Sequence, residues 1–414
     1  MAASGEFRGV CRALVRLGTL ALLGLSALGL GAASGSLGSG GGASVLFSPV
    51  EREAILRHGP WPPAAFPPAD PGNPLSGQAR AIELGQRLFF DTALSASGDV
   101  SCASCHVPGL QFADGRARSS PAMTRHTPSL WNAVHQRWQG WDGAADSLWS
   151  QAIRPLLDPR ELASSPEHIR RRVVADAELS CRWQAAVGQP VEQMSADAVL
   201  VSAARALGAF TATLQSPRTP FDDFRDALAR EDRRALQAYP AAAQRGLRLF
   251  VGEGHCALCH QGPLFTHGEY ADIGLPFFVR PGVVDSGRHG GIEALLASRF
   301  NRLSPWAVQA DATPVRHLHP QHRNFGEFRV PSLRGVAQTA PYMHDGQLAR
   351  LQDVIHHYST VSDERLHADG ERLLRALHLD DQQQADLLAF LQTLSAPAGA
   401  GWRPARLGPC RPAR

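Results

Sequence analysis

The sequence predicts a mainly α-helical fold with long loops, built as two similar domains. Apolar residues recur at helical spacing in several segments, whereas the alternation that marks strands is scarce. A Cys-x-x-Cys-His motif occurs twice, at residues 102–106 and 256–260. A similar stretch precedes each copy, Gly85–Phe89 before the first and Gly246–Phe250 before the second. This internal repeat predicts that the two domains arose by duplication.

The expected helices follow one another along the chain with one long interruption. The first is Ala79–Phe90, which leads into the first motif. Residues 276–326 form the longest stretch without periodicity and are expected to be irregular. The other helices are expected at 146–155, 166–188, 196–214, 240–250, 348–359 and 383–394.

The N-terminus has the three parts of a secretory signal peptide. Arg8, Arg12 and Arg16 form a positive region. Leu17–Leu30 is apolar, and small residues follow at 32–34. The apolar run is short for a membrane span. We therefore expect export to the periplasm and a mature chain without a stable membrane span.

Five parts are predicted along the chain. Residues 34–43 are rich in Gly and Ser, as flexible linkers are. The tail is rich in Pro, Gly and Arg and is expected to be disordered. The predicted parts are a signal peptide (1–35), a linker and N-terminal extension (36–75), an N-terminal domain (76–225), a C-terminal domain (226–396) and a tail (397–414).

The charge pattern argues against a nucleic-acid partner. All 41 basic residues are Arg, and they are nearly balanced by 38 acidic residues, which leaves a net charge of +3. Arg is spread along the chain and does not gather into the basic patch that nucleic acids require. No nucleic-acid partner is expected.

The compartment decides how the seven cysteines are interpreted. In an oxidising compartment, paired cysteines form disulfides unless a cofactor binds them. Cys11 lies in the predicted signal peptide, so Cys181 and Cys410 are left over beside the two motifs. A disulfide between these two is one outcome, which their separation in sequence cannot test.

The two motifs indicate two covalently bound haem c groups. In a Cys-x-x-Cys-His motif the thiols form thioethers with one haem, and the adjacent His binds its iron. A redox disulfide and half of a zinc site are the other interpretations of a single copy. Two copies in an exported chain, each after a similar helix, favour haem. The expected attachment residues are Cys102, Cys105 and His106 for one haem, and Cys256, Cys259 and His260 for the other.

Several longer runs surround the motifs. They are Thr127–Ala133, Trp141–Ala144, Ser147–Ala152, Val330–Arg334 and Ala340–Gly346. Together with the motifs, these runs resemble the di-haem cytochrome c peroxidase/MauG family over about residues 76–395. The resemblance implies two cytochrome-c-like helical domains, with the haems on either side of their interface.

The resemblance implies that hydrogen peroxide reacts at the N-terminal haem. In the peroxidases of this family a distal His caps that haem until a reduction step. No His lies between His106 and His126 here, which implies an open haem, with His126 as the alternative cap. Gln151, Pro155 and Glu161 match the spacing of the MauG distal pocket. Glu161 would move a proton between the peroxide oxygens, and Gln151 would orient the peroxide.

The resemblance also assigns the second axial ligand of the C-terminal haem. The peroxidases use Met at this position, whereas MauG uses Tyr. Tyr358 matches the position, with Met343 as the alternative. A phenolate stabilises ferric and higher iron states, whereas a Met thioether favours ferrous iron. Trp141 matches the family position between the haems, where an indole would relay charge.

Calcium is left open by the sequence. In the family, an Asn just before the Thr-Pro pair binds a calcium ion between the domains. His126 stands at that position here, and imidazole is a poor ligand for a hard cation. Carbonyl and water ligands would still be enough for a site.

The resemblance as a whole implies an exported enzyme. It would react with hydrogen peroxide at the N-terminal haem and, through a high-valent di-haem state, oxidise a partner protein. Arg137–Gly143 and His58–Trp61 are most similar to the MauG/MbnH-like branch, which oxidises Trp on a partner. Two alternatives stay open. One is a peroxidase that takes electrons from a small redox protein, and the other is a di-haem electron carrier without catalysis.

Overall fold

The computed structural model describes residues 46–63, 70, 72–275, 278–280, 282–308, 313–362, 374–397 and 400–410. Residues 43–414 form one compact unit. The predicted signal peptide, residues 1–35, lies outside the described residues. None of the described helices is long and apolar enough to cross a membrane.

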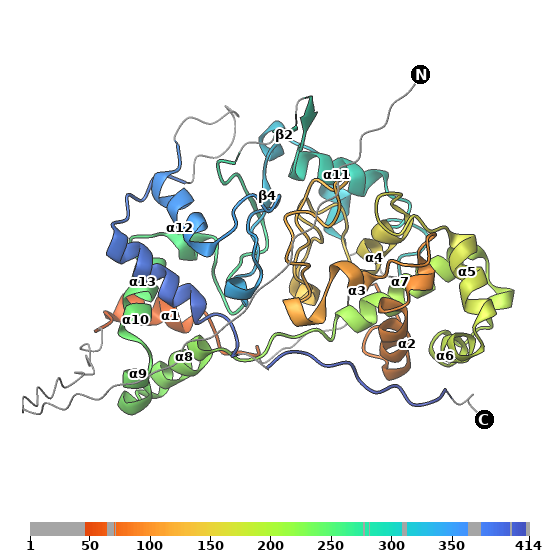
Figure 1. The fold of residues 1–414 in the computed structure, drawn as a ribbon, viewed down its shortest axis with the longest axis horizontal. Coiled ribbons are helices and arrows are strands. Elements are labelled where there is room, and N and C mark those ends of the chain that lie inside the picture. The colour runs from red at the N-terminus through yellow and green to blue at the C-terminus, as the bar shows by residue number, and fades with distance from the viewer. Residues whose placement is uncertain are drawn as a thin grey trace, which may run out of the picture. The chain divides into compact units, whose positions relative to one another are not determined.

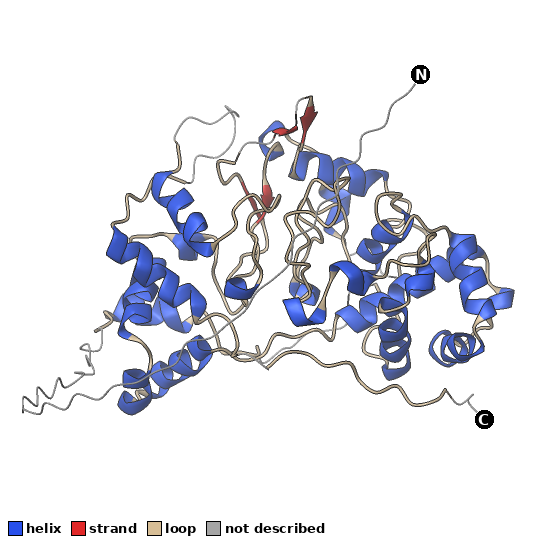
Figure 2. Ribbon diagram, viewed as in Figure 1, coloured by secondary structure: helices blue, strands red, loops and turns tan. Residues whose placement is uncertain are grey.

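Helices dominate the described residues, as the sequence predicts (Figure 2). The short strands pair antiparallel, β1 (Tyr270–Ala271) with β4 (Phe328–Arg329) and β2 (Phe278–Arg280) with β3 (Val283–Val284). The helices are α1 (Pro49–Leu56), α2 (Ala79–Phe89), α3 (Cys102–Cys105), α4 (Leu148–Leu157), α5 (Pro166–Ala175), α6 (Ala177–Val187), α7 (Ala196–Thr211), α8 (Pro220–Arg230), α9 (Arg233–Ala238), α10 (Ala241–Val251), α11 (Arg288–Ala297), α12 (Leu351–Thr360) and α13 (Asp381–Gln392).

A first hydrophobic core gathers α2, α4, α5, α6 and α7 (Figure 1). α7 is buried almost all round, as expected of a helix inside a core. α2 crosses it at very short range. A Cβ on Gly85 would lie 2.0 Å from the carbonyl oxygen of Ala206. Glycine is therefore required for these two helices to approach so closely.

A second core gathers α1, α8, α10, α12 and α13 (Figure 1). Here α10 crosses α13, and a Cβ on Gly246 would lie 1.9 Å from the carbonyl oxygen of Asp386. Phe221 of α8 packs in this core, whereas Leu214 belongs to the first. The change of core therefore falls before α8, so that the whole of α8 lies with the C-terminal helices.

The two ends of the described chain cross to opposite cores. α1 begins at a capping box formed by Ser48 and Glu51, and it buries Ile55 in the second core. Trp402 packs against the first core, and a disulfide joins Cys181 of α6 to Cys410. The disulfide left open by the sequence is thus confirmed.

One prediction is corrected by these end segments. Residues 400–410 are held in place and not disordered, because the Trp402 ring and the disulfide anchor them. Composition missed this, since a partly buried aromatic ring and one cross-link outweigh a Pro- and Gly-rich background. The predicted linker and N-terminal extension (36–75) contains α1.

Two further expectations about helices differ from the structure. Residues 166–188 form two helices, because the side chain of Asp176 accepts from the Leu179 amide and caps the start of α6. Residues 276–326 are not all irregular, since α11 and the β2–β3 hairpin lie there. Gly290 and Gly291 interrupt the apolar periodicity, so the sequence did not predict α11. Gly291 is needed because a Cβ there would lie 2.0 Å from the Asp142 carbonyl oxygen.

Candidate functional site

The first Cys-x-x-Cys-His motif forms one helical turn that ends at its histidine. α3 contains both cysteines, and His106 follows it directly. Nδ1 of His106 donates a hydrogen bond to the Phe112 carbonyl at 2.9 Å. A carbonyl only accepts, so Nδ1 carries the proton and Nε2 keeps its lone pair. Burial lowers the pKa of His106 and keeps the ring neutral, which is the form that binds a metal.

The second motif has the same arrangement. Nδ1 of His260 donates to the Phe265 carbonyl at 3.0 Å. Burial lowers the pKa of His260 to about 4, so this ring is neutral as well. The carbonyls of Pro128 and Pro331 also lie within hydrogen-bonding reach of the His106 and His260 rings respectively. Both Nε2 atoms are thereby held ready to bind iron.

The four motif cysteines fit covalent haem attachment better than redox chemistry. All four are free thiols in the structure. Burial raises the pKa of Cys102 and of Cys256 to about 12, and it raises that of Cys105 and Cys259 as well. A reactive dithiol needs a lowered thiol pKa. Neutral thiols beside a ligand-ready imidazole are the set that haem c requires.

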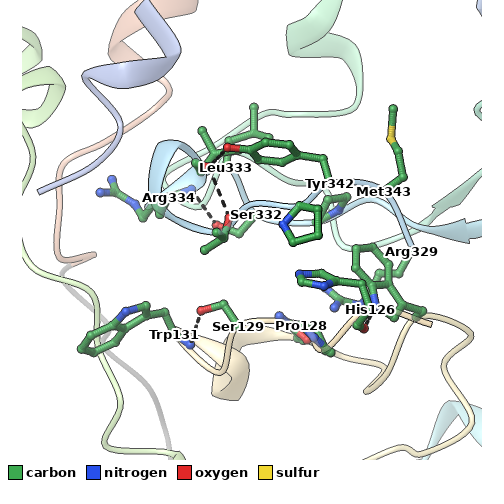
Figure 3. A pocket seen from close by; sticks show the side chains of 16 residues that line it. His126, Pro128, Ser129, Trp131, Arg329, Ser332, Leu333, Arg334, Tyr342 and Met343 are labelled. Carbon is green, nitrogen blue, oxygen red and sulfur yellow. Dashed lines mark hydrogen bonds between the residues drawn. The ribbon is translucent and has the colours of Figure 1, made fainter. Parts of the chain in front are cut away.

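A pocket lies between the two halves of the chain, next to both histidines. Pro128, Ser129 and Trp131 line one side of it, and residues 331–334 line the other (Figure 3). These residues belong to the runs Thr127–Ala133 and Val330–Arg334. Since Pro128 and Pro331 are in the lining, the pocket adjoins both Cys-x-x-Cys-His motifs.

Trp141 connects the two halves at this pocket. Its indole N–H donates to the His126 carbonyl at 2.8 Å, and its own carbonyl accepts from the Arg329 amide at 2.9 Å. The Arg329 guanidinium lies 6.0 Å from the indole ring centre. Arg329 is buried, makes no salt bridge within the described part of the chain, and has one Nη atom without a hydrogen-bond partner. A buried cation therefore faces the indole.

α4 carries Gln151 and Pro155, and Glu161 lies in the loop that follows it. Glu161 is close enough to the first motif for its charge to act on both cysteines. Burial raises the thiol pKa of Cys102 and Cys105, and the nearby charge of Glu161 adds to this effect. Burial also raises the pKa of Glu161 itself. Oε1 of Gln151 is buried without a hydrogen-bond partner. The Gln151 oxygen is thus free to accept a hydrogen bond, and Glu161 is a carboxyl group with a perturbed pKa near the first motif.

Tyr358 of α12 lies beside the second motif. Burial raises the pKa of its phenol, and the neighbouring Cys256 and Cys259 raise it further. The phenol is therefore close to both attachment cysteines of that motif. Met343, the alternative ligand, is part of the lining of the pocket between the halves (Figure 3).

His126 makes contacts of a different kind. Nδ1 of its ring donates to the Arg116 carbonyl at 2.7 Å, and its side chain lines the pocket that Trp141 also lines.

For calcium, the described residues contain no group of three or more His, Cys, Asp or Glu that could hold a metal ion.

Sequence reasoning missed an ion-pair network beside the pocket. Arg125 contacts Asp142 at 2.6 Å and Asp285 at 2.7 Å, which joins the two halves. Asp285 lies in the stretch expected to be irregular, so no sequence pattern indicated that it would pair with Arg125. Arg329 was missed as well. It precedes Val330-Pro331 just as His126 precedes Thr127-Pro128, so an alignment of the two repeats would have found it.

Two helical cores, each holding a Cys-x-x-Cys-His motif with a neutral histidine, define a di-haem c-type cytochrome. Residues 79–230 match the family model of di-haem cytochrome c peroxidases. The methylamine utilization protein MauG of Methylorubrum extorquens is 34% identical over 80% of this chain and 82% of its own length. The cytochrome c551 peroxidase of Pseudomonas aeruginosa is 31% identical over 76% of this chain and 77% of its own.

Solved structures agree with these relatives. A MauG-like protein associated with microbial copper homeostasis has a TM-score of 0.61 and 27% identity, covering 82% of this chain and 97% of its own. The diheme peroxidase BthA of Burkholderia thailandensis shares the fold, with a TM-score of 0.61 and 24% identity over 80% of this chain and 91% of its own.

The chain belongs to the di-haem cytochrome c peroxidase/MauG family. It is a haem-dependent oxidoreductase with two haem c groups.

Proposed function

We propose that this chain is an exported enzyme that reacts with hydrogen peroxide at its N-terminal haem and oxidises a partner protein, with Trp as the preferred target. The N-terminal domain, predicted at 76–225, is the peroxidatic domain in this proposal. The C-terminal domain, predicted at 226–396 and including the whole of α8, is the electron-transfer domain. The two are related by duplication. The partners are hydrogen peroxide and a protein substrate, which the enzyme meets in the periplasm.

The position of Tyr358 is the observation that carries this proposal over the alternatives. Its phenol lies near Cys256 and Cys259, and Tyr358 would be the second ligand of the iron held by His260. The raised pKa means that iron must displace the phenol proton, as metal binding to a protonated ligand requires. A hard anionic oxygen donor favours oxidised iron, which suits a site that holds oxidising equivalents for a partner.

Glu161 and Gln151 supply the polar groups for peroxide. A haem held by His106 would supply an iron that can accept peroxide. Glu161 would take a proton from one peroxide oxygen and return it to the other. The free Oε1 of Gln151 accepts a hydrogen bond from the peroxide and orients it. Pro155 lies in the same helix as Gln151 and shapes the wall of the site.

Trp141 couples the two domains in this proposal. Its indole lies in the pocket that adjoins both histidine motifs. The Arg329 cation over the ring opposes the loss of an electron from the indole. Trp141 would therefore relay charge between the two domains without being the group that stays oxidised.

The proposal is tested by adding one equivalent of hydrogen peroxide to the as-isolated diferric protein. Absorption and EPR spectra should start from one high-spin and one low-spin iron and change rapidly without prior reduction. A reaction that occurs only after half-reduction would identify the peroxidase that uses a small redox protein. No reaction in either state would indicate that the protein is a di-haem electron carrier without catalysis.

The ligand assignment is tested separately by three variants. Tyr358→Phe should change the low-spin EPR signal, because the second axial ligand is lost. Tyr239→Phe is the matched control, since this buried tyrosine of the same core bonds Thr393 and lies outside the site. Met343→Leu should leave the signal unchanged. If Met343→Leu changes the signal and Tyr358→Phe does not, Met343 is the ligand. The chain is then a peroxidase that takes electrons from a small redox protein.

A further inference from the structure

Two phenylalanine carbonyls hold the axial histidines, and each of these phenylalanines is covered by a ring from a distant chain end. Phe112 accepts from His106, and Phe265 accepts from His260. Phe112 is covered by Trp402 of the tail, whereas Phe265 is covered by His58, which follows α1. Each covering residue comes from the end of the chain that crosses to the opposite core.

The C-terminal segment is fastened to the first core at several points. The Trp402 ring lies 5.5 Å from the Phe112 ring and 5.7 Å from the Phe210 ring, centre to centre, and it stacks on Phe90 at 6.1 Å. Ala405 exchanges two backbone hydrogen bonds with the side-chain amide of Gln86.

The disulfide completes this attachment. It joins Cys410 to Cys181 of α6, and Arg182, the next residue, donates to the Gly408 carbonyl. A partly buried aromatic ring, two hydrogen bonds to the Gln86 amide and a cross-link thus fasten this segment to the first core.

The N-terminal segment is fastened to the second core in a corresponding way. The His58 ring lies 4.8 Å from the Phe265 ring, and its Nε2 lies 3.1 Å from the His260 carbonyl oxygen. Its Nδ1 lies 2.9 Å from the Ala54 carbonyl oxygen. Arg225 of α8 donates twice to the Leu56 carbonyl and so fixes the end of α1. His58 is fully surrounded, with 2% of its surface exposed.

We infer that Trp402 and His58 are positioning residues, each of which fixes the axial histidine of one haem through the phenylalanine it covers. A hydrogen bond from Nδ1 of an axial histidine raises the basicity of the ligand, and its strength depends on where the accepting carbonyl is held and on how dry it is. Each ring keeps its phenylalanine in place and excludes water from that carbonyl. The inference rests on His106 and His260 as iron ligands and does not depend on which substrate the enzyme oxidises.

The first test compares Trp402→Ala with two other tryptophan variants in the full-length holoprotein. Trp402→Ala should lower the Fe–His stretching frequency of the ferrous N-terminal haem and shift its midpoint potential, while the C-terminal haem keeps its potential. Trp402→Phe should restore both values, because a ring is present again. Trp306→Ala is the matched control, since Trp306 is another half-buried tryptophan packed on the same core.

The second test uses the other chain end. His58→Leu should shift the midpoint potential and the EPR g-values of the C-terminal haem and leave the Fe–His frequency of the N-terminal haem unchanged. The Cys181→Ala/Cys410→Ala double variant keeps Trp402 but releases the end of the tail. It should shift the N-terminal haem in the same direction as Trp402→Ala, by a smaller amount.

The outcomes separate positioning from packing. If Trp402→Ala or His58→Leu only lowers the melting temperature, and both haems keep their frequencies and potentials, the inference is wrong. It is also wrong if Trp306→Ala produces the same shift as Trp402→Ala, or if either variant shifts both haems equally. The peroxide titration of the wild-type protein is independent of these readouts, so failure of the inference and failure of the proposed function can be told apart.

Discussion

At the scale of single residues, the site is marked by polar groups whose burial is not compensated. Gln151 has a buried Oε1 without a partner, and Glu161 has a pKa raised by burial. A structural carboxylate would normally be paired or hydrogen-bonded. The Gln151 oxygen is therefore free to accept a hydrogen bond from a bound molecule, and the roles expected of Gln151 and Glu161 stay predictions.

Glu161 gives the prediction at this scale. Its carboxyl pKa lies above the usual value of about 4.3, so the group becomes a base only as the pH rises through this raised pKa. The rate of reaction with peroxide should therefore increase with pH in a range above about 4.3. Glu161→Gln should abolish this pH dependence and lower the rate roughly 10²- to 10⁴-fold. Stopped-flow absorption across the pH range measures both effects.

Glu167→Gln is the control for that measurement, because Glu167 is an exposed acidic residue in the first turn of α5. It should keep both the rate and the pH profile of the wild type. If the rate in Glu161→Gln keeps the pH dependence of the wild type, Glu161 does not transfer the proton, and its burial reflects packing alone.

At the scale of elements, both cores depend on a helix crossing at glycine. α2 crosses α7 at Gly85, and α10 crosses α13 at Gly246. Each glycine begins the Gly-x-x-x-Phe run that precedes a Cys-x-x-Cys-His motif. The crossing sets the distance between the helix that leads into the motif and the helix behind it.

We predict that Gly246→Ala destabilises the protein by about 3 kcal/mol, because the added Cβ overlaps backbone that cannot move without separating α10 from α13. Gly85→Ala should have a similar cost in the first core. Gly401→Ala is the control, because no atom lies within 4 Å of a Cβ built there. Denaturant unfolding followed by circular dichroism measures the difference. Equal stability of Gly246→Ala and Gly401→Ala would contradict the close crossing.

At the scale of the whole molecule, the two halves are joined by the ion pairs of Arg125. Burial opposes the ionisation of Asp142 and Asp285, but Arg125 more than offsets it, and the pKa of both carboxyls lies below the usual value. Both carboxylates are nearly inaccessible to water. The loss of Arg125 would leave Asp285 without its arginine and Asp142 with only the more distant Arg154 at 3.8 Å, which is more costly than the loss of a surface pair.

Depressed carboxyl pKa values fix the sign of the pH dependence. The stabilisation is fully present above the unfolded-state value of about 3.9 and is lost as the pH falls through the lower folded-state values. We expect Arg125→Leu to cost about 3–5 kcal/mol near neutral pH and to flatten the loss of stability in acid. Equilibrium unfolding as a function of pH measures both.

Arg299→Ala is the matched control for this prediction. Arg299 makes a similar two-point contact with Asp197, but the arginine is 62% exposed. Its removal should cost no more than about 1 kcal/mol, because water screens the pair. If Arg125→Leu behaves like Arg299→Ala, the buried network does not hold the halves together.

The sequence by itself determined the chemistry of the attachment sites and most of the helices. The spacing of two cysteines and a histidine is local, and so is the 3.6-residue period of α2, α7, α10 and α13. Such features depend on neighbours along the chain, so a reader of the sequence can find them without knowing the fold.

Only the tertiary structure decided which distant groups meet. It placed Tyr358 beside Cys256 and Cys259, joined Cys181 to Cys410, and turned the glycine-rich 288–297 into a helix. It also put Trp402 and His58 over the phenylalanines that hold the axial histidines. These contacts span tens to hundreds of residues. They are fixed by packing and charge pairing between particular elements. The apolar period shows which face of a helix is buried, but it does not show which distant group that face meets.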